Sequence, residues 1–267
     1  MTDPLTDFDW ASHWQRLVDQ REHEVPIDPD QDFWAPPIRT LMYDPAAVQD
    51  DPLLKVVEPY LGPRKTAIDA GAGAGRHAVP LAERLDWVTA VEPSEAMRSR
   101  IPHRDNLTVV ASAWQDAEVA PADLVICAHV LYFVADVVPF LRKLETAARE
   151  RVFVFMRDRP MLTPSEALFE VLTGKARARM PQLSDFWNLQ RSFGVDADLV
   201  IVEYETQQVY GDVEEAAAEC RFRLGRLWRE DEGTAWLESS LTKRDDGLLV
   251  YGGPMVAGIA HWQPRPR

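Results

Sequence analysis

The residues best suited to chemistry lie in a short glycine-rich turn. The chain reads Ile68-Asp69-Ala70-Gly71-Ala72-Gly73-Ala74-Gly75, so an apolar run ends in an acid and three glycines follow at alternate positions. Glycine lets the backbone approach a ligand and adopt positive φ, and the helix predicted after the turn offers unpaired N–H groups. A strand, a tight turn and a helix start in this order predict a pocket for a nucleoside-bearing ligand.

The spacing of the glycines separates two classes of cofactor site. A dinucleotide-binding fingerprint reads G-x-G-x-x-G. Counted from Gly71 and Gly73, that pattern requires a glycine at position 76, where the chain has Arg76. The observed order therefore disfavours a nicotinamide-dependent oxidoreductase, which is kept only as the weaker enzyme alternative.

Other candidate ligand groups follow the next predicted strands. Glu92 ends the second strand, where a carboxylate can accept hydrogen bonds from both hydroxyls of a ribose. Ala113 and Trp114 follow the third strand and can offer a backbone amide and an aromatic surface to a purine, while Ala128 and His129 end the fourth. Because ligands bind beyond the carboxyl ends of strands in an open α/β sheet, these four strand ends predict one adenosyl site.

The elements that must position these residues are short apolar strands alternating with helices. The predicted strands are 66–70, 87–92, 107–111, 122–128 and 151–157, and the helices between them are 75–85, 94–101 and 135–149. This alternation predicts a parallel sheet covered by helices on both faces.

Helix-rich segments flank that core. The helical patterns are 5–24, 51–61, 164–174, 183–193, 213–230 and 233–242, with strands at 198–205 and in the region 247–263. We expect residues 1–60 to form an N-terminal helical arm or lid. Residues 61–267 then form the main domain, with helical cap insertions at about 159–195 and 206–245.

Composition narrows the possible partners. The 267 residues include 43 acidic and 29 basic side chains, for a formal net charge of −14. Such a surface repels nucleic-acid phosphates and anionic lipid, so neither nucleic acid nor a membrane is an expected partner. With two cysteines, no long apolar run and no cationic start before an apolar stretch, the sequence favours a cytoplasmic protein.

Three motifs in order resemble the class I S-adenosylmethionine-dependent methyltransferases of small-molecule type. They are the glycine-rich turn, then Val91-Glu92-Pro93-Ser94-Glu95-Ala96-Met97, then Ala122-Asp123-Leu124-Val125-Ile126-Cys127-Ala128-His129-Val130-Leu131. The resemblance covers residues 66–157, and in outline the two later strands. It implies a Rossmann-like, doubly wound α/β fold with a seven-stranded sheet and an antiparallel last strand, here with a helical cap added.

The resemblance also implies roles for matching positions. Gly71, Gly73 and Gly75 would line the methionine part of the cofactor, with Asp69 nearby, and Glu92 would hold the ribose. Ala113 and Trp114 would border the adenine, and Ala128 and His129 would lie near the methionine part and the transferring methyl group. Further cofactor-binding positions would be Ala72, Pro93 and Met97. Many relatives carry an acid after the third strand, where this chain has Trp114 and then Asp116. Which of the two meets the adenine is left open.

Several residues have two possible roles at this stage. His129 is a candidate general base or simply a hydrogen-bonded histidine at a strand end. Tyr132 and Arg157 either line the acceptor pocket or pack, Arg157 with an ion pair to Asp158. Trp34 and Tyr43 either cover the cofactor or pack against the sheet edge. No histidine shows metal-ligand spacing, so no metal site is predicted.

The function that these patterns predict is methyl transfer from S-adenosylmethionine to a small-molecule acceptor. A non-catalytic binder of S-adenosylmethionine or S-adenosylhomocysteine is the alternative from another class. The acceptor and the oligomeric state are not predicted.

Overall fold

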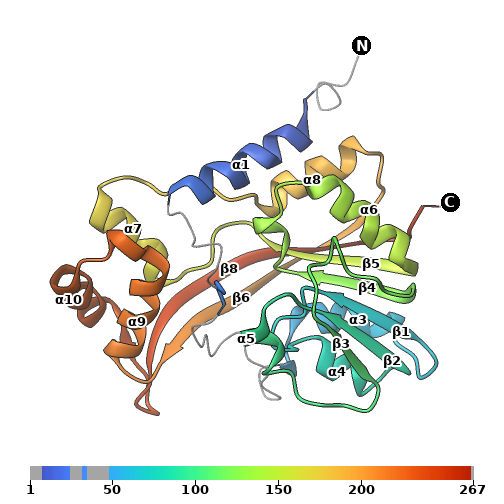
Figure 1. Ribbon diagram of the computed structural model, residues 1–267, viewed down its shortest axis with the longest axis horizontal. Coiled ribbons are helices and arrows are strands. Elements are labelled where there is room, and N and C mark those ends of the chain that lie inside the picture. Colours follow the sequence, from blue (N-terminus) through green and yellow to red (C-terminus); the bar gives the residue numbers. More distant parts are fainter. Residues whose placement is uncertain (1–7, 25–31, 35–47, 266–267) are drawn as a thin grey trace.

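The fold is a twisted sheet between helices, with a helical lobe beside one end (Figure 1). The computed structural model describes residues 8–24, 32–34 and 48–265. The strands are β1 (Thr66–Ala70), β2 (Trp87–Val91), β3 (Leu107–Val110), β4 (Ala122–Ala128), β5 (Ala148–Arg157), β6 (Asp198–Tyr210), β7 (Thr242–Lys243) and β8 (Leu249–Trp262). All five strands predicted between residues 66 and 157 are present.

The strand order β3-β2-β1-β4-β5-β8-β6 reverses direction at β1, as in a doubly wound sheet. The first five strands pair in parallel, and β8 is antiparallel to both β5 and β6. The predicted seven strands with a reversed last strand are confirmed. An eighth strand, β7, adds a two-residue pairing with β8 that the sequence analysis missed.

Two layers of helices cover the sheet. The helices are α1 (Trp10–Glu24), α3 (Pro52–Val57), α4 (Ala78–Ala82), α5 (Glu95–Arg98), α6 (Val137–Ala147), α7 (Pro164–Thr173), α8 (Leu183–Ser192), α9 (Val213–Leu224) and α10 (Glu230–Ser240), with 3-10 turns η2 (Glu58–Tyr60), η3 (Leu131–Phe133) and η4 (Gly225–Leu227). Helices α1, α6 and α8 pack on one face, and α3 and α4 pack on the other.

Alternation along the strands supplies the two apolar layers. Ile68 and Val125 face the layer of α1, α6 and α8, whereas Ala67 and Leu124 face α3 and α4. This period of two is the expected pattern for a sheet buried on both faces. The sheet is thereby held rigidly enough to position the loops at its carboxyl edge.

A third apolar cluster forms the helical lobe, which we define as α7, α9 and α10. It packs around Leu168, Cys220 and Leu237, with Tyr210 from the end of β6. In Figure 1 the lobe lies at the far ends of the long strands β6 and β8. The predicted strand 198–205 in fact continues to Tyr210, and the predicted helix 213–230 ends at Leu224 because Gly225 turns to φ +51°.

Helix α8 does not belong to that lobe. It contacts α1 and β8 and packs in the layer with α6, although the sequence grouped it with α7 as one insertion. Both helices are amphipathic, and periodicity alone does not say which apolar surface a helix covers. In the part of the chain that the structure describes, no helix combines the length and apolarity needed to cross a membrane.

Candidate cofactor and acceptor site

The glycine-rich turn opens toward solvent at its middle position. Gly71, Gly73 and Gly75 have φ values of +83°, +55° and +88°, which explains the residue type at each. A Cβ at Gly71 would lie 2.3 Å from Val130 Cγ2, and one at Gly75 would lie 2.9 Å from Val79 Cγ2. A Cβ at Gly73 would meet nothing within 4 Å, so this is the position where a ligand can approach the backbone.

The carboxylate of Glu92 is fixed directly beside that opening. Its Oε2 accepts from the N–H of Gly73 at 2.8 Å, and its Oε1 accepts from the N–H of Ser94 at 2.8 Å. Ser94 in turn caps α5 by accepting from the N–H of Met97. Each carboxylate oxygen has a second lone pair, so Glu92 can still accept hydrogen bonds from a ligand. Burial raises the pKa of Glu92.

Asp69 is a buried acid next to the last residue of β1, and a backbone contact from Ala78 stabilises its ionised form only in part. Its side chain is buried, and within the described residues neither carboxylate oxygen accepts a hydrogen bond of ordinary geometry. Burial raises the pKa of Asp69 to about 6, with His77 opposing the shift and Glu92 adding to it. A buried carboxylate without partners is costly and therefore favours a cationic ligand group.

These three features fit the cofactor that the resemblance implies. S-adenosylmethionine combines ribose hydroxyls, which suit the spare acceptors of Glu92, with positive charge, which suits Asp69. In the sequence, the exposed backbone of Gly73 lies between Asp69 and Glu92. No steric feature of the turn opposes a ligand there, since an added Cβ would meet no atom.

A charged cluster under the turn was missed by the sequence analysis. Buried Asp51 accepts from Arg76 Nε at 2.9 Å and lies 3.4 Å from His77 Nε2, and its other oxygen accepts from the N–H groups of Leu53 and Leu54 at the start of α3. Although burial opposes ionisation, His77 and Arg76 hold the pKa of Asp51 well below its usual value. The Asp-Pro pair at 51–52 signals a helix start, but nothing in the sequence links it to the residues after the glycines.

The ends of β4 and β5 are tied together through His129 and Tyr132. The N–H of His129 donates to the carbonyl of Phe155 at 2.9 Å, and the residue adopts φ +61°, which is unusual for a side chain other than glycine. Its Nδ1 lies 3.2 Å from the Tyr132 hydroxyl, which also accepts from the N–H of Arg157 at 2.6 Å. Burial, with the charge of Arg157 adding to it, lowers the pKa of His129 well below its ordinary value. The imidazole is therefore neutral at physiological pH.

Arg157 does not form the ion pair with Asp158 that the sequence left open. Its guanidinium lies 4.9 Å from the centre of the Tyr132 ring, and Nη1 lies 3.3 Å from Met161 Sδ. Within the described residues no carboxylate lies within ion-pair distance of it, and its Nε is buried without a hydrogen-bond partner.

Trp114 packs in the core between the sheet and α6. The indole is 3% exposed, and its Nε1 lies 3.4 Å from the carbonyl of Phe140. The Lys143 ammonium lies 5.1 Å from the ring centre. These contacts match the packing alternative for the ring, and its contact with adenine stays a prediction.

Residues 32–34 of the N-terminal arm reach the carboxyl edge of the sheet. The Asp32 carboxylate accepts from Ser94 Oγ at 2.7 Å and from the N–H of Ala96 at 3.3 Å, beside Glu92. Trp34 packs edge-on against Phe133 of η3, with ring centres 6.0 Å apart. Tyr43, the other aromatic residue predicted for this arm, lies outside the described residues.

The same segment also contacts the helical lobe. Arg223 of α9 donates to the Phe33 carbonyl at 3.0 Å, and its guanidinium lies 3.9 Å from the centre of the Phe33 ring. Residues 32–34 therefore connect α5, η3 and α9, three elements that are far apart in the sequence.

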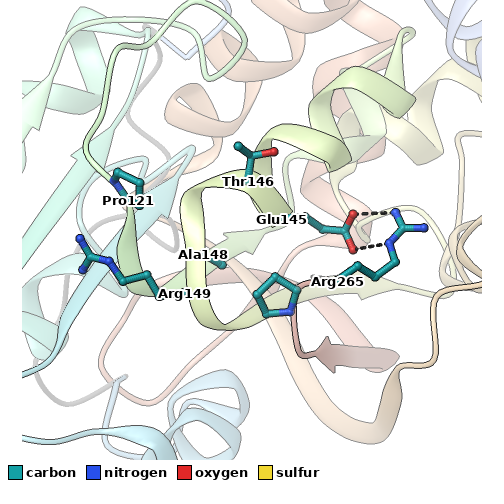
Figure 2. Close-up of a pocket in the computed structure, with 7 residues that line it drawn as sticks. Pro121, Glu145, Thr146, Ala148, Arg149 and Arg265 are labelled. Atoms are coloured by element: carbon teal, nitrogen blue, oxygen red, sulfur yellow. Dashed lines mark hydrogen bonds and ion pairs between the residues drawn. The ribbon is translucent and has the colours of Figure 1, made fainter. Parts of the chain in front are cut away.

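A separate hollow lies at the opposite edge of the sheet, where β4 and β5 begin (Figure 2). It measures about 610 Å³ and is lined by Pro121, Glu145, Thr146, Ala148, Arg149, Pro264 and Arg265. Glu145 and Arg265 face one another across 2.7 Å, and Arg149 lies 3.7 Å from Asp123. The charged residues that line it thus already have ion-pair partners, and none of the predicted site residues lines it. Among the described residues no group of three or more His, Cys, Asp and Glu side chains could hold a metal ion.

Comparison with known proteins agrees with the motif order and the sheet topology. Residues 68–156 match the sequence profile of a methyltransferase domain. Residues 68–156 are thus similar to a methyltransferase domain. The matched segment of that domain runs from the glycine-rich turn to the end of β5 and includes Glu92 and His129.

Individual relatives of the domain are distant. An uncharacterized protein of Haemophilus influenzae is 28% identical over 178 residues, which is 63% of this chain and 65% of that protein, less than two thirds of its length. A provisionally assigned methyltransferase of Bacillus halodurans superposes with a TM-score of 0.53 at 12% identity, over 80% of this chain and 99% of its own. Another provisionally assigned methyltransferase, from an antibiotic biosynthesis pathway of Anabaena variabilis, superposes with a TM-score of 0.53 at 16% identity. The superposition covers 82% of this chain and 98% of that protein. At these identities the two structures establish the shared fold.

Proposed function

We propose that this protein transfers a methyl group from S-adenosylmethionine to a small-molecule acceptor. The observation that carries the proposal is the opening at Gly73, with the carboxylate of Glu92 bonded to its N–H and the unpaired carboxylate of Asp69 near it. The net charge of −14 supports a small molecule over nucleic acid as acceptor. The small number of cysteines, two in all, suits a protein of the cytoplasm.

The residues proposed to hold the cofactor come from four strand ends. Gly71, Gly73, Gly75 and Asp69 would hold the methionine part, Glu92 the ribose, Ala113 and Trp114 the adenine, and Ala128 and His129 the region of the methyl group. Ala72, Pro93 and Met97 would also contact the cofactor. When bound, S-adenosylmethionine supplies a methyl group that its positively charged sulfur already activates. The protein's contribution is then to hold the acceptor in line and close to that methyl group, which can lower a barrier by roughly 7–11 kcal/mol in favourable cases.

The acceptor pocket is proposed to lie beyond β4 and β5, lined by Tyr132 and Arg157. Trp34 and Tyr43 of the N-terminal arm would close it. The helical lobe, which takes α7 from the predicted insertion 159–195 and α9 and α10 from the predicted insertion 206–245, would supply its cap. The contacts of residues 32–34 with α5 and α9 support this arrangement, because they lead from the ribose side to the helical lobe. Closure of this kind excludes water from the reacting groups.

His129 is proposed as the residue that accepts a proton where the acceptor must lose one. Its lowered pKa keeps the imidazole neutral, which a base requires, although it also makes the ring a weaker proton acceptor. Burial raises the pKa of Tyr132, so its phenol stays protonated and can orient Nδ1 of His129.

Radioactive methyl transfer tests the proposal against a non-catalytic binder. The protein is incubated with labelled S-adenosylmethionine and a metabolite extract, and the small molecules are separated. We expect a labelled product with the wild type. Glu92→Ala removes the fixed carboxylate, so it should weaken S-adenosylhomocysteine binding by about 1–3 kcal/mol. Glu95→Ala, which changes an exposed acid of α5, should not weaken it. Binding of S-adenosylhomocysteine without any labelled product would favour the binder.

A further inference from the structure

We infer that the methyl acceptor carries a carboxylate group on an aromatic body, and that the guanidinium of Arg157 binds this carboxylate. The inference rests on the proposed function and deepens it by assigning the acceptor's charge and shape. It concerns the region beyond β4 and β5.

Arg157 occupies the last position of β5, beside the proposed methyl site. Phe155, two residues earlier, pairs with Ala128 of β4 and accepts from the N–H of His129. The N–H of Arg157 itself donates to the Tyr132 hydroxyl, which also lies 3.2 Å from His129 Nδ1. A group bound by this guanidinium would therefore lie close to His129.

The charge of Arg157 has no counterpart in the described part of the chain. Its Nε is buried without a hydrogen bond, and no acid lies within ion-pair distance. Arg157 is half-buried, with its Nε inaccessible to solvent. Two other arginines with little exposure are paired: Arg177 with Glu166 at 2.7 Å and Arg223 with Glu219 at 3.7 Å. Because a cation with buried atoms normally has an anionic partner, we expect a ligand to supply the missing partner of Arg157.

The surroundings of Arg157 indicate the shape of that ligand. Its guanidinium lies over the Tyr132 ring, and the Phe155 ring contacts His129 at 4.3 Å and Tyr204 at 6.1 Å between ring centres. Burial raises the pKa of Tyr204 to about 12, and the positive charge of Arg157 opposes that shift, which is consistent with the two lying near each other. Of these rings, those of His129 and Tyr204 are half-buried and Phe155 and Tyr132 are buried. Partly exposed aromatic rings suit a planar ligand, and a planar guanidinium pairs best with a carboxylate through two parallel hydrogen bonds.

The test compares matched probes on protein saturated with S-adenosylhomocysteine. We expect 4-hydroxybenzoate to bind at least tenfold more tightly than 4-hydroxybenzamide in ligand-observed NMR titrations. Arg157→Gln should remove that preference, and Arg157→Lys should retain part of it because the charge remains. Arg149→Gln, at the opposite edge of the sheet, is the control and should bind as the wild type does.

Calorimetry with S-adenosylhomocysteine separates this inference from the proposed function. Arg157→Gln should change that affinity by less than twofold. A tenfold loss would mean that Arg157 binds the cofactor's own carboxylate, and would overturn the inference while leaving the proposed function in place. Equal binding of acid and amide, or a preference for phenyl phosphate over the carboxylate, would also overturn it. Failure of the wild type to bind S-adenosylhomocysteine would instead contradict the proposed function.

Discussion

The Asp69 carboxyl is buried in the core, and burial opposes its ionised form. Its pKa of about 6 lies roughly two units above the ordinary value, so ionisation at neutral pH destabilises the fold by roughly 3 kcal/mol. Leaving such a group unpaired is reasonable where its charge meets a ligand, since natural proteins accept such costs chiefly at functional sites.

Replacing Asp69 by asparagine tests that account through pH. A carboxyl whose folded pKa is raised contributes stability that is fully present below about pH 4 and is lost as the pH rises through about 6. Asp69→Asn removes this loss, so the variant should be more stable than the wild type by up to about 3 kcal/mol at pH 8 and similar to it at pH 4. Urea denaturation across this range measures the difference. A difference independent of pH would show that the Asp69 carboxyl titrates normally in the folded protein.

The candidate site was predictable where its parts follow consecutive strands. The turn at 71–75 and Glu92 end neighbouring parallel strands, so their meeting follows from topology, and the 2.8 Å bond between Gly73 and Glu92 agrees with it. The partnership of Asp51 with Arg76 was not predictable, because the acid precedes the sheet and no pattern sets how α3 packs under the turn.

Helix α9 links the N-terminal arm to the rest of the lobe through one buried pair. Arg223 lies 3.7 Å from Glu219, and both side chains are 8% exposed. Glu219 also accepts from the Tyr210 hydroxyl at the end of β6, while Arg223 bonds to the Phe33 carbonyl. The pair therefore joins α9, β6 and the arm, and each charge depends on the other for its burial.

Breaking this pair should destabilise the protein strongly. Arg223→Met leaves the Glu219 carboxylate buried without its cation, which costs about 3–5 kcal/mol in comparable cases. The double variant with Glu219→Gln should recover part of that loss, because no uncompensated charge remains. Thermal or urea unfolding measures both.

The exposed pair Arg229–Glu232 in the same region provides the control. Its side chains are 61% and 58% exposed, so Arg229→Met should change the free energy of unfolding by less than about 1 kcal/mol. Similar effects of Arg223→Met and Arg229→Met would contradict a special role for the buried pair.

The molecule as a whole consists of a sheet with two covering layers and the helical lobe at the ends of β6 and β8 (Figure 1). The strand order was predictable from three motifs and the alternation of strands and helices. The make-up of the lobe was not, because the apolar stripes of α7 and α8 resemble each other while only α7 packs on α9 and α10. The apolar surface that an amphipathic helix covers therefore depends on its tertiary contacts, which its own periodicity does not specify.

Hydrogen exchange tests whether the lobe is a separate cooperative unit. Its apolar cluster is smaller than the two that cover the sheet, so its amides should open at a lower free energy than those of β1, β4 and β5. Native-state exchange at rising denaturant concentration measures both groups. Identical opening free energies would show that lobe and sheet unfold together.

Ligand approach to the backbone at Gly73 is the central feature of the proposed site, and one pair of variants tests it directly. Gly73 and Gly194 have φ values of +55° and +68°, and an added Cβ would meet nothing within 4 Å at either. Gly73→Ala and Gly194→Ala should therefore lose similar stability, about 1–2 kcal/mol. In calorimetry with S-adenosylhomocysteine we predict that Gly73→Ala weakens binding at least tenfold while Gly194→Ala binds as the wild type does. Equal affinities in all three proteins would contradict the central claim.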